Sequence, residues 1–327
     1  MQNQATDQTQ GFQNSRRRRT PEIDERAAIA ELAMRYARND MLAFMQAVWR
    51  MPNRVNRDGE SVFSFKIGRH TRAICDRLTR AVEDWQRGRS TYLLVNIPFR
   101  HGKSDMVSRA LPAYFLGHCA AQNPDVVMRG YGADLVEGFS RNAKAIIRSD
   151  AYRAVFPGVE IDPDRDSVSG WGVNGSMGTV TVAGLGGAIT GKGGHLIILD
   201  DYCKNREEAY SETYRDKTWQ SFSVDLMTRQ NSPAAIVIVC ATPWHLDDVT
   251  GRIKKATKED PEFPPFEELC FPARKPPEYD ILFPEMYGPE WYSGQRASLG
   301  PTAAAALLDC NPVGDGTRMF RPEWFRT

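Results

Sequence analysis

The chain has 327 residues, of which 41% are hydrophobic and 25% are charged, and its formal net charge at pH 7 is only +1. This composition is ordinary for a globular protein, and the length suggests about two domains. The weak net charge excludes a whole-molecule field that attracts nucleic acid, so any such affinity must come from local patches.

The six cysteines are scattered and form no CxxC pair. This argues against a zinc site and a disulfide framework, and it favours a reducing cytosol. No apolar run approaches the ~20 residues that cross a bilayer, so we expect no membrane segment. Residues 1–22 are polar and lack the apolar core of a signal peptide. We expect a disordered basic tail there, in which Arg16–Arg19 form a solvated charge cluster or, alternatively, a nucleic-acid contact.

Two helical patterns precede the first apolar run. Residues 22–49 show helical spacing of apolar side chains without Pro or Gly, and a second pattern of this kind runs from about 70 to 85. Four apolar runs then predict buried strands, each followed by a helix or a turn: residues 91–97, 125–131, 195–201 and 234–242. After the run at 195–201 we expect a long helical stretch up to Met227. Strands that alternate with helices indicate a parallel α/β sheet covered on both faces.

Two other segments depart from this pattern. Residues 167–194 are Gly-rich and contain an alternating "TVTVAG", which suits an inserted hairpin. After about Lys258 the chain becomes Pro-rich, which we interpret as a small irregular subdomain rather than more sheet. We therefore divide the chain into a tail (1–22), an α/β domain (23–258) and a lid or linker subdomain (259–327).

Gly102, Lys103 and Ser104 lie where the first predicted strand turns into a helix. A bound triphosphate needs backbone N–H donors, a helix N-terminus and a lysine that reaches the outer phosphates. The serine hydroxyl would then ligate Mg²⁺. The glycine that usually comes five residues before Gly102 is replaced by Ile97, so a chance Gly-Lys-Ser remains the alternative.

The stretch "GGHLIILDD" (193–201) ends a predicted strand in two acids. In nucleotide hydrolases the first acid holds Mg²⁺ and the second polarises the attacking water, which assigns these roles to Asp200 and Asp201. A polar turn or a helix cap is the alternative. Because ligands gather at the carboxyl ends of strands in open α/β sheets, we expect the acids and Lys103 to share one edge.

The strand that begins "IVIVCATPWHLDD" (236–248) places Thr242 at the same edge, where its hydroxyl could sense the γ-phosphate. His245 with the acids at 247 and 248 could hold a metal or exchange protons. We favour a helix start capped by acidic residues. For His101, next to the glycine of the loop, we favour a role in shaping the loop over general base catalysis.

Together these motifs resemble the ATPase half of the large terminase subunit of tailed bacteriophages, the motor that packs viral DNA into preformed heads. The resemblance covers residues 44–325 and rests on "FKIGRHTRAICDRL", "VNIPFRHGKS", "YGADLVEGFSRNAKAII", "GGAITGKGGHLIILDD", "ATPWHLDDVTGRI" and "RPEWF". In that family the loop commonly lacks its first glycine, so Ile97 is a family variant. The implied fold is a P-loop NTPase of the ASCE type, with a mostly parallel sheet flanked by helices.

The resemblance implies roles for individual residues. Asp201 would be the catalytic carboxylate, and Ser104 and Asp200 would hold Mg²⁺. Residues 65–72 would contact adenine, and Thr242 would couple hydrolysis to DNA movement. The cofactor ATP would be bound by Arg100, His101, Gly102, Lys103, Ser104, Asp105 and Thr242.

Two positions depart from the family pattern. Asp201 stands where relatives often have Glu, one methylene longer. Lys192 stands where many relatives place an arginine finger, a residue that would act on the neighbouring subunit's nucleotide in a ring-shaped motor, and lysine lacks the planar guanidinium fork. The candidates for this finger are Lys192, Arg141 and Arg148, with a plain surface cation as the alternative for each.

The resemblance further implies an ATP-driven motor that translocates double-stranded DNA. It would work in the host cell cytoplasm as a homo-oligomeric ring, a pentamer, on a portal protein, with a small terminase subunit that delivers DNA. Sequence-independent phosphate contacts would come from Arg252, Lys254, Lys255 and Lys258. The family's usual nuclease half is not in this sequence, so we expect no nuclease activity. The alternatives are a helicase-like P-loop ATPase and a non-hydrolysing DNA-binding scaffold.

Overall fold

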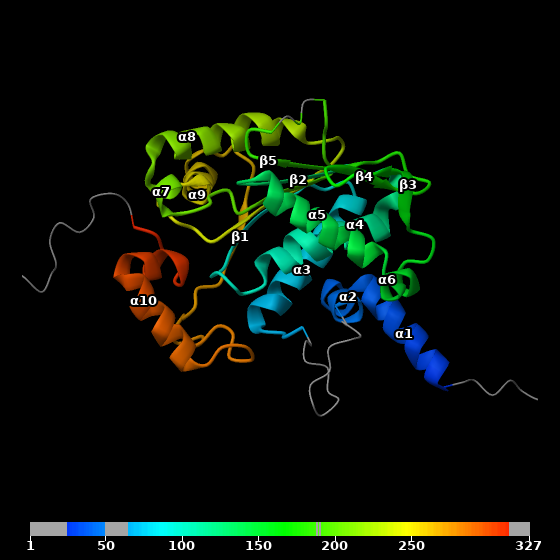
Figure 1. Cartoon of the computed structure of the whole chain (residues 1–327), viewed down its shortest axis with the longest axis horizontal. Coiled ribbons are helices and arrows are strands. Elements are labelled where there is room, and N and C mark those ends of the chain that lie inside the picture. The colour runs from blue at the N-terminus through cyan, green and yellow to red at the C-terminus, as the bar shows by residue number, and fades with distance from the viewer. Residues whose placement is uncertain (1–24, 50–64, 188, 190, 314–327) are drawn as a thin grey trace, which may run out of the picture.

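An eight-stranded sheet forms the centre of the structure, a computed structural model that describes residues 25–49, 65–187, 189 and 191–313 (Figure 1). The predicted tail at 1–22, with its arginine run, and the segment "RPEWF" lie outside the described residues. The strand order is β3-β4-β5-β2-β6-β7-β1-β8. The strands are β1 (Thr91–Asn96), β2 (Val126–Gly130), β3 (Ile161–Asp166), β4 (Gly170–Val173), β5 (Val180–Gly184), β6 (Leu196–Asp200), β7 (Ile236–Ala241) and β8 (Glu267–Cys270).

Six of these strands, β5, β2, β6, β7, β1 and β8, run parallel, and β3 and β4 extend the sheet antiparallel beyond β5. The register aligns Asp200 with Cys240, and Cys240 with Val95. The strand before Gly102 and the strand that carries Asp200 are therefore separated by β7 alone and end at the same edge. The sheet and its strand order confirm the expected ASCE-type α/β fold.

The four strands predicted from apolar runs are confirmed as β1, β2, β6 and β7. All five residues of β6 and all six of β7 are buried. This is typical of parallel strands that are covered on both faces. Successive side chains point to opposite faces, so Leu93 joins the core on one face of the sheet and Leu94 joins the core on the other.

Helices form a layer on each face of the sheet (Figure 1). The first core packs α2 (Met41–Val48), α3 (Arg69–Gln86), α4 (Leu111–Cys119), α5 (Ala133–Ile147) and α6 (Asp150–Val155) against the strands, with α1 (Glu25–Asn39) outside them. The second core packs α7 (Arg206–Tyr210), α8 (Glu212–Gln220) and α9 (Val249–Glu259). Helix α10 (Pro289–Leu307), near the end of the described chain, belongs to neither layer and packs in a small third core with Phe99 and Ala273. Among the described helices, none has both the length and the apolar character that crossing a membrane requires.

Two predicted helices are interrupted by capping side chains. The pattern at 22–49 forms two helices because Asp40 takes an extended conformation and its Oδ1 accepts a hydrogen bond from the Ala43 N–H, 2.7 Å away. The stretch before Met227 is likewise divided, because Ser211 caps α8 through the Tyr214 N–H. The prediction of continuous helices was therefore wrong at these two positions.

One prediction about the sheet is confirmed and one needs correction. The "TVTVAG" segment is β5, which forms the predicted hairpin with the antiparallel β4 and joins it to the main sheet by pairing parallel with β2. The expectation of no further strand after Lys258 was wrong, because β8 pairs parallel with β1. The prolines lie just outside this four-residue edge strand, where they remove no ladder hydrogen bond.

Candidate active site

The loop after β1 has the backbone shape that phosphate binding requires. Arg100 and Gly102 have positive φ values of 62° and 80°, and the helical turns begin at Lys103. The Met106 N–H donates to the Gly102 carbonyl at 3.1 Å, which starts the first turn. The N–H groups at the start of this turn have no helical partner, so the loop and helix form a potential anion site.

The two acids lie at the carboxyl end of β6. Asp200 is completely buried, and Asp201 turns the chain with a positive φ of 47°. The Asp201 N–H donates to the Cys240 carbonyl at 3.0 Å, and its own carbonyl accepts from the Tyr131 N–H at 2.8 Å. A Cβ on Gly130 would come within 2.6 Å of the Asp200 carbonyl oxygen, so β2 approaches this turn closely because it has a glycine there.

Lys103 and Asp201 are 98 residues apart in sequence, and the Lys103 Nζ lies 2.7 Å from the Asp201 Oδ2. Burial alone would lower the pKa of Lys103, but the carboxylates of Asp201 and Asp200 outweigh it and raise that pKa above its ordinary value. The lysine is therefore charged at neutral pH. The convergence of loop and acids that the sequence suggested is present.

Asp200 offers an oxygen atom that no group of the described chain satisfies. Its Oδ2 accepts a hydrogen bond from Ser108 Oγ at 2.6 Å, whereas its buried Oδ1 has no hydrogen-bond partner. Burial, followed by the charge of Asp201, raises the pKa of Asp200 to about 6, and the hydroxyls of Ser108 and Ser104 oppose this rise. A buried carboxylate oxygen without a partner is unfavourable, and a cation would satisfy it.

These donors fit Mg²⁺ that is bound together with a nucleotide. The described residues contain no group of three or more His, Cys, Asp or Glu that could hold a metal ion by itself. Mg²⁺ usually takes one or two protein oxygens and completes its octahedron with phosphate oxygens and water. The Asp200 carboxylate and the Ser104 hydroxyl are suitable protein ligands of this kind.

The other predicted loop residues are held by neighbours. The buried ring of His101 makes contacts of 2.7 Å with the Phe99 carbonyl and with the Tyr292 hydroxyl, and burial lowers its pKa to about 4. It therefore packs as a neutral ring into the structure around the loop. Asp105 pairs with Arg109 one turn along the helix.

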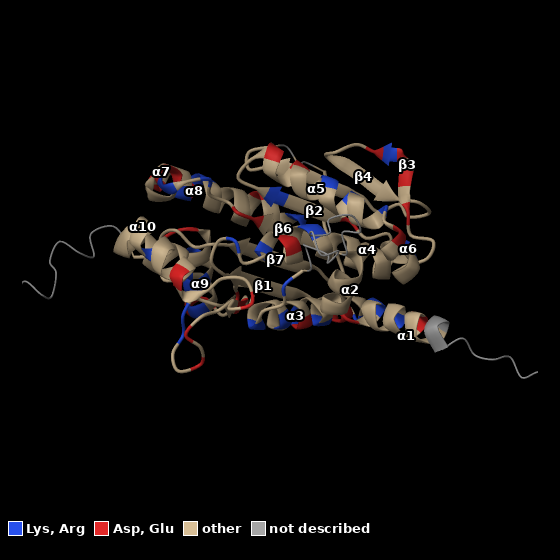
Figure 2. Ribbon diagram, turned by 60° about the horizontal axis from the view of Figure 1, so that its bottom comes forward, with Lys and Arg blue, Asp and Glu red and all other residues tan. Residues whose placement is uncertain are grey.

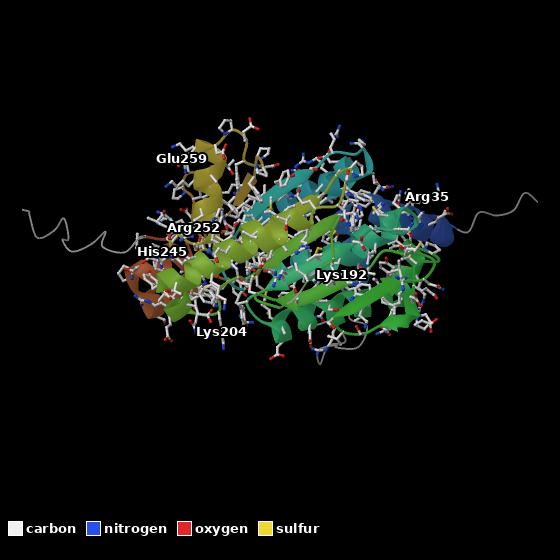
Figure 3. The ribbon with its side chains drawn as sticks, turned by 90° about the horizontal axis from the view of Figure 1, so that it is seen from above. Arg35, Lys192, Lys204, His245, Arg252 and Glu259 are labelled. Atoms are coloured by element: carbon white, nitrogen blue, oxygen red, sulfur yellow. The ribbon has the colours of Figure 1, made fainter. Side chains whose placement is uncertain are left out.

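The three finger candidates do not join the Lys103–Asp201 pair within this chain. Lys192 lies before β6, whereas Asp201 lies after that strand. Figure 3 shows Lys192 well apart from Lys204, which follows the two acids by three residues. Arg141 lies about two turns into α5 and pairs with Glu137 at 3.0 Å. Arg148, at the end of α5, pairs with Asp166.

The predicted helix cap at the start of α9 is confirmed. Asp248 accepts hydrogen bonds from the N–H groups of Gly251, Trp244 and His245. The candidate DNA-binding cations of this helix are largely occupied by acids: Arg252 pairs with Asp216 and Asp247, Lys254 with Glu268, and Lys255 with Glu259. Positive and negative side chains are likewise interspersed along α1 and α3 (Figure 2).

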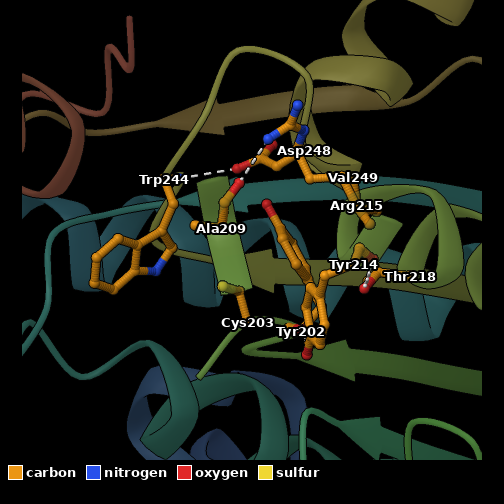
Figure 4. A pocket seen from close by; sticks show the side chains of 9 residues that line it. All are labelled: Tyr202, Cys203, Ala209, Tyr214, Arg215, Thr218, Trp244, Asp248 and Val249. Atoms are coloured by element: carbon orange, nitrogen blue, oxygen red, sulfur yellow. Dashed lines mark hydrogen bonds between the residues drawn. The ribbon is translucent and has the colours of Figure 1, made fainter. Parts of the chain in front are cut away.

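Two cavities lie close to the acidic turn. One, of about 10 Å³, has room for about one water molecule beneath Tyr202, and Figure 4 shows Asp248 and Arg215 among its lining residues. The other, of about 440 Å³, lies between the ends of β2 and β5 and helix α8. Its lining includes Tyr131, whose N–H holds the Asp201 carbonyl.

Sequence reasoning missed several residues around the site. Ser108, which binds Asp200, lies four residues after Ser104, so helical spacing could have placed both hydroxyls on one face. Tyr287 and Tyr292 contact the loop from more than 180 residues away, and no local pattern signals them.

Thr242 links the end of β7 to the start of the loop, since its hydroxyl donates to the Ile97 carbonyl at 3.1 Å. We expect Thr242→Val to lower the free energy of unfolding by about 1 kcal/mol, because this bond is lost with little change in shape. Urea unfolding would measure the loss. Thr257→Val is the matched control, because that buried hydroxyl has no hydrogen-bond partner in the described structure. Equal losses in the two variants would contradict the expectation.

The chain resembles known proteins in sequence and in fold. Residues 94–327 match the family model described as "Terminase large subunit, T4likevirus-type, N-terminal". The chain is similar to the large terminase from a thermophilic bacteriophage (crystal form 2), with 10% identity and a TM-score of 0.46 over 79% of this chain and 57% of that chain. It is also similar to the HK97 bacteriophage large terminase, with 16% identity and a TM-score of 0.48 over 83% of this chain and 54% of that one. The chain thus spans little more than half the length of these terminases. No curated protein matches the sequence.

Proposed function

Because the chain belongs to the family of T4likevirus-type terminase large subunits, whose N-terminal model matches 94–327, we propose that it is an ATP hydrolase module that translocates double-stranded DNA into a prohead. The observation that supports this most directly is the meeting of Lys103 with Asp201 beside the unsatisfied Oδ1 of Asp200. Phosphoryl transfer needs a lysine that follows a glycine in the loop and two acids at the end of a nearby strand. Here the loop follows β1, and the acids follow β6, which is separated from β1 by β7.

In this proposal the backbone N–H groups of the loop and the Lys103 ammonium bind the outer phosphates, with Arg100 and Asp105 at the ends of the loop. Ser104 and Asp200 hold Mg²⁺, which neutralises negative charge on the phosphates when it is bound. Asp201 orients the attacking water and accepts its proton. Lys103 exchanges its contact with Asp201 for one with phosphate, which frees that carboxylate for water.

Other assignments extend the same proposal. Thr242 couples the site to DNA movement, and its bond to the Ile97 carbonyl gives it a direct contact with the start of the loop. His101 acts through the shape of the loop, and residues 65–72 contact adenine. Lys192, Arg141 or Arg148 acts on a neighbouring subunit, since none of them joins the acids in its own chain. The division into an ATPase domain up to 258 and a lid or linker after it belongs to this proposal as well, except that β8 (Glu267–Cys270) pairs with β1 and therefore counts with the ATPase domain.

The partners in this proposal are double-stranded DNA, a portal protein and a small terminase subunit, and the working form is a homo-oligomeric ring, a pentamer, in the host cell cytoplasm. The basic side chains of α9 are the candidate DNA contacts. These side chains can contact DNA phosphates only when their ion pairs with acids open. We expect DNA binding through the α9 cations to weaken steeply as the salt concentration rises.

ATP turnover by the full chain, with and without duplex DNA and over a range of protein concentrations, tests the proposal. We expect turnover that depends on Mg²⁺, rises with DNA and increases per subunit with concentration, because a neighbour completes the site. Nucleotide binding without hydrolysis under all these conditions would overturn it in favour of a scaffold. Strand displacement without a portal would favour a helicase-like ATPase.

A further inference from the structure

Two tyrosines pack against the phosphate loop: Tyr287, in the segment that leads into α10, and Tyr292, in the first turn of that helix. The Tyr287 hydroxyl donates to the Arg100 carbonyl at 3.0 Å, and the Tyr292 hydroxyl lies 2.7 Å from Nε2 of His101. Both loop residues immediately precede Gly102. The contacts therefore act on the part of the loop that sets the direction of the N–H groups facing a phosphate.

The hydrogen-bond partners of His101 determine which of its two ring nitrogens carries the proton. A carbonyl can only accept, so the 2.7 Å contact between His101 Nδ1 and the Phe99 carbonyl places the ring proton on Nδ1. Nε2 of the neutral ring then accepts, and Tyr292 must donate to it. The tyrosine oxygen accepts in turn from the Phe283 N–H at 3.2 Å, which completes a chain from the α10 segment to the loop.

A third contact completes the support. Nε2 of His70, in the first turn of α3, lies 3.0 Å from the His101 carbonyl, so that nitrogen carries the proton and donates it. The carbonyls of residues 100 and 101 and the ring of His101 thus all have partners, and the contacts of His101 are buried or partly buried, whereas that of the Arg100 carbonyl is exposed. This support holds Arg100 in a left-handed conformation that non-glycine residues rarely adopt.

We propose that Tyr287 and Tyr292 are positioning residues for phosphate binding. Tyr287 holds the Arg100 carbonyl and Tyr292 holds the His101 ring, so that the N–H groups of the following residues face the ligand. The inference rests on the proposed function, since it assigns these tyrosines to the same nucleotide site. Because coupling between two sites is reciprocal, phosphate binding in turn stabilises the packing of α10 on the loop.

The test uses the full chain and the variants Tyr292→Phe, Tyr287→Phe and the double variant, with MgADP as the probe in calorimetric titrations. Each single variant removes one hydroxyl, and we expect the Kd for MgADP to rise about fivefold to tenfold, with a larger rise in the double variant. The KM for ATP should rise in parallel, while kcat stays within about twofold. Tyr279→Phe is the matched control, because its hydroxyl donates to the Pro272 carbonyl in the same segment and not to the loop.

Hydrogen exchange separates positioning from a general loss of stability. In the wild-type chain MgADP should slow amide exchange in residues 287–307, and in the double variant this slowing should be absent. An equal slowing in both chains, or a Kd of Tyr292→Phe equal to that of Tyr279→Phe, would overturn the inference alone. Failure of the wild-type chain to bind MgADP and hydrolyse ATP would overturn the proposed function and this inference with it.

Discussion

Asp201→Asn should reduce ATP turnover by at least about 10²-fold, the contribution typical of a general base. Asn has nearly the same shape but cannot accept a proton from water. Asp201 lies beyond the buried strand, and its backbone is held by Cys240 and Tyr131, so we expect the variant to fold. Turnover in the presence of duplex DNA, together with the circular dichroism of the purified variant, measures both parts of this expectation.

Asp280→Asn is the control for the loss of one carboxylate. Its side chain is 81% exposed and pairs with the similarly exposed Arg274, so the change should leave turnover and stability unchanged. Wild-type turnover in Asp201→Asn would contradict its assignment as the catalytic carboxylate. The remaining site residues would then have to activate water without it.

Lys103→Met is expected to weaken MgADP binding by about 10- to 100-fold, because a charged hydrogen bond to phosphate contributes roughly 1.5–3 kcal/mol. Turnover should fall further, since charge on the transferred phosphoryl group grows in the transition state. Met keeps the length of the side chain and fits the buried path from the loop. Calorimetric titration with MgADP and steady-state turnover measure the two effects separately.

Lys275→Met provides the comparison for Lys103. Its side chain is about half exposed, and its ammonium pairs with Glu278 three residues along the chain. Its removal should change neither binding nor turnover. If the two lysine variants bound MgADP equally well, Lys103 would have no part in holding phosphate, and its pairing with Asp201 would be purely structural.

The central strands could be predicted because they are parallel and covered on both faces. Such strands are continuous apolar runs with polar ends, and β6 and β7 have this pattern. The core of the candidate site followed from the same reasoning. The polar residues at the carboxyl ends of parallel strands lie along one edge of the sheet, and so Lys103 and Asp201 could be placed at the same edge from the sequence alone.

Features that depend on distant contacts could not be predicted in this way. Strand β8 begins with Glu267 and Glu268, and it forms only because the edge of β1 offers it partners. The tyrosines that hold the loop come from the segment leading into α10 and from the first turn of that helix, where nothing local marks them. The break at Asp40 was a different kind of miss, because Asp is a common cap and its position next to an apolar run could have been used.

The two outermost strands of the sheet have a consequence for crowded assemblies. Strand β3 contains Pro163 and three aspartates, and β8 is only four residues long, with its two glutamates paired to Arg77 of α3 and Lys254 of α9. Proline and charge on an edge strand oppose its extension by a strand from another molecule. Many copies of this chain can therefore accumulate side by side without fusing into a continuous sheet, and any lasting contact between them must be made by side chains and loops.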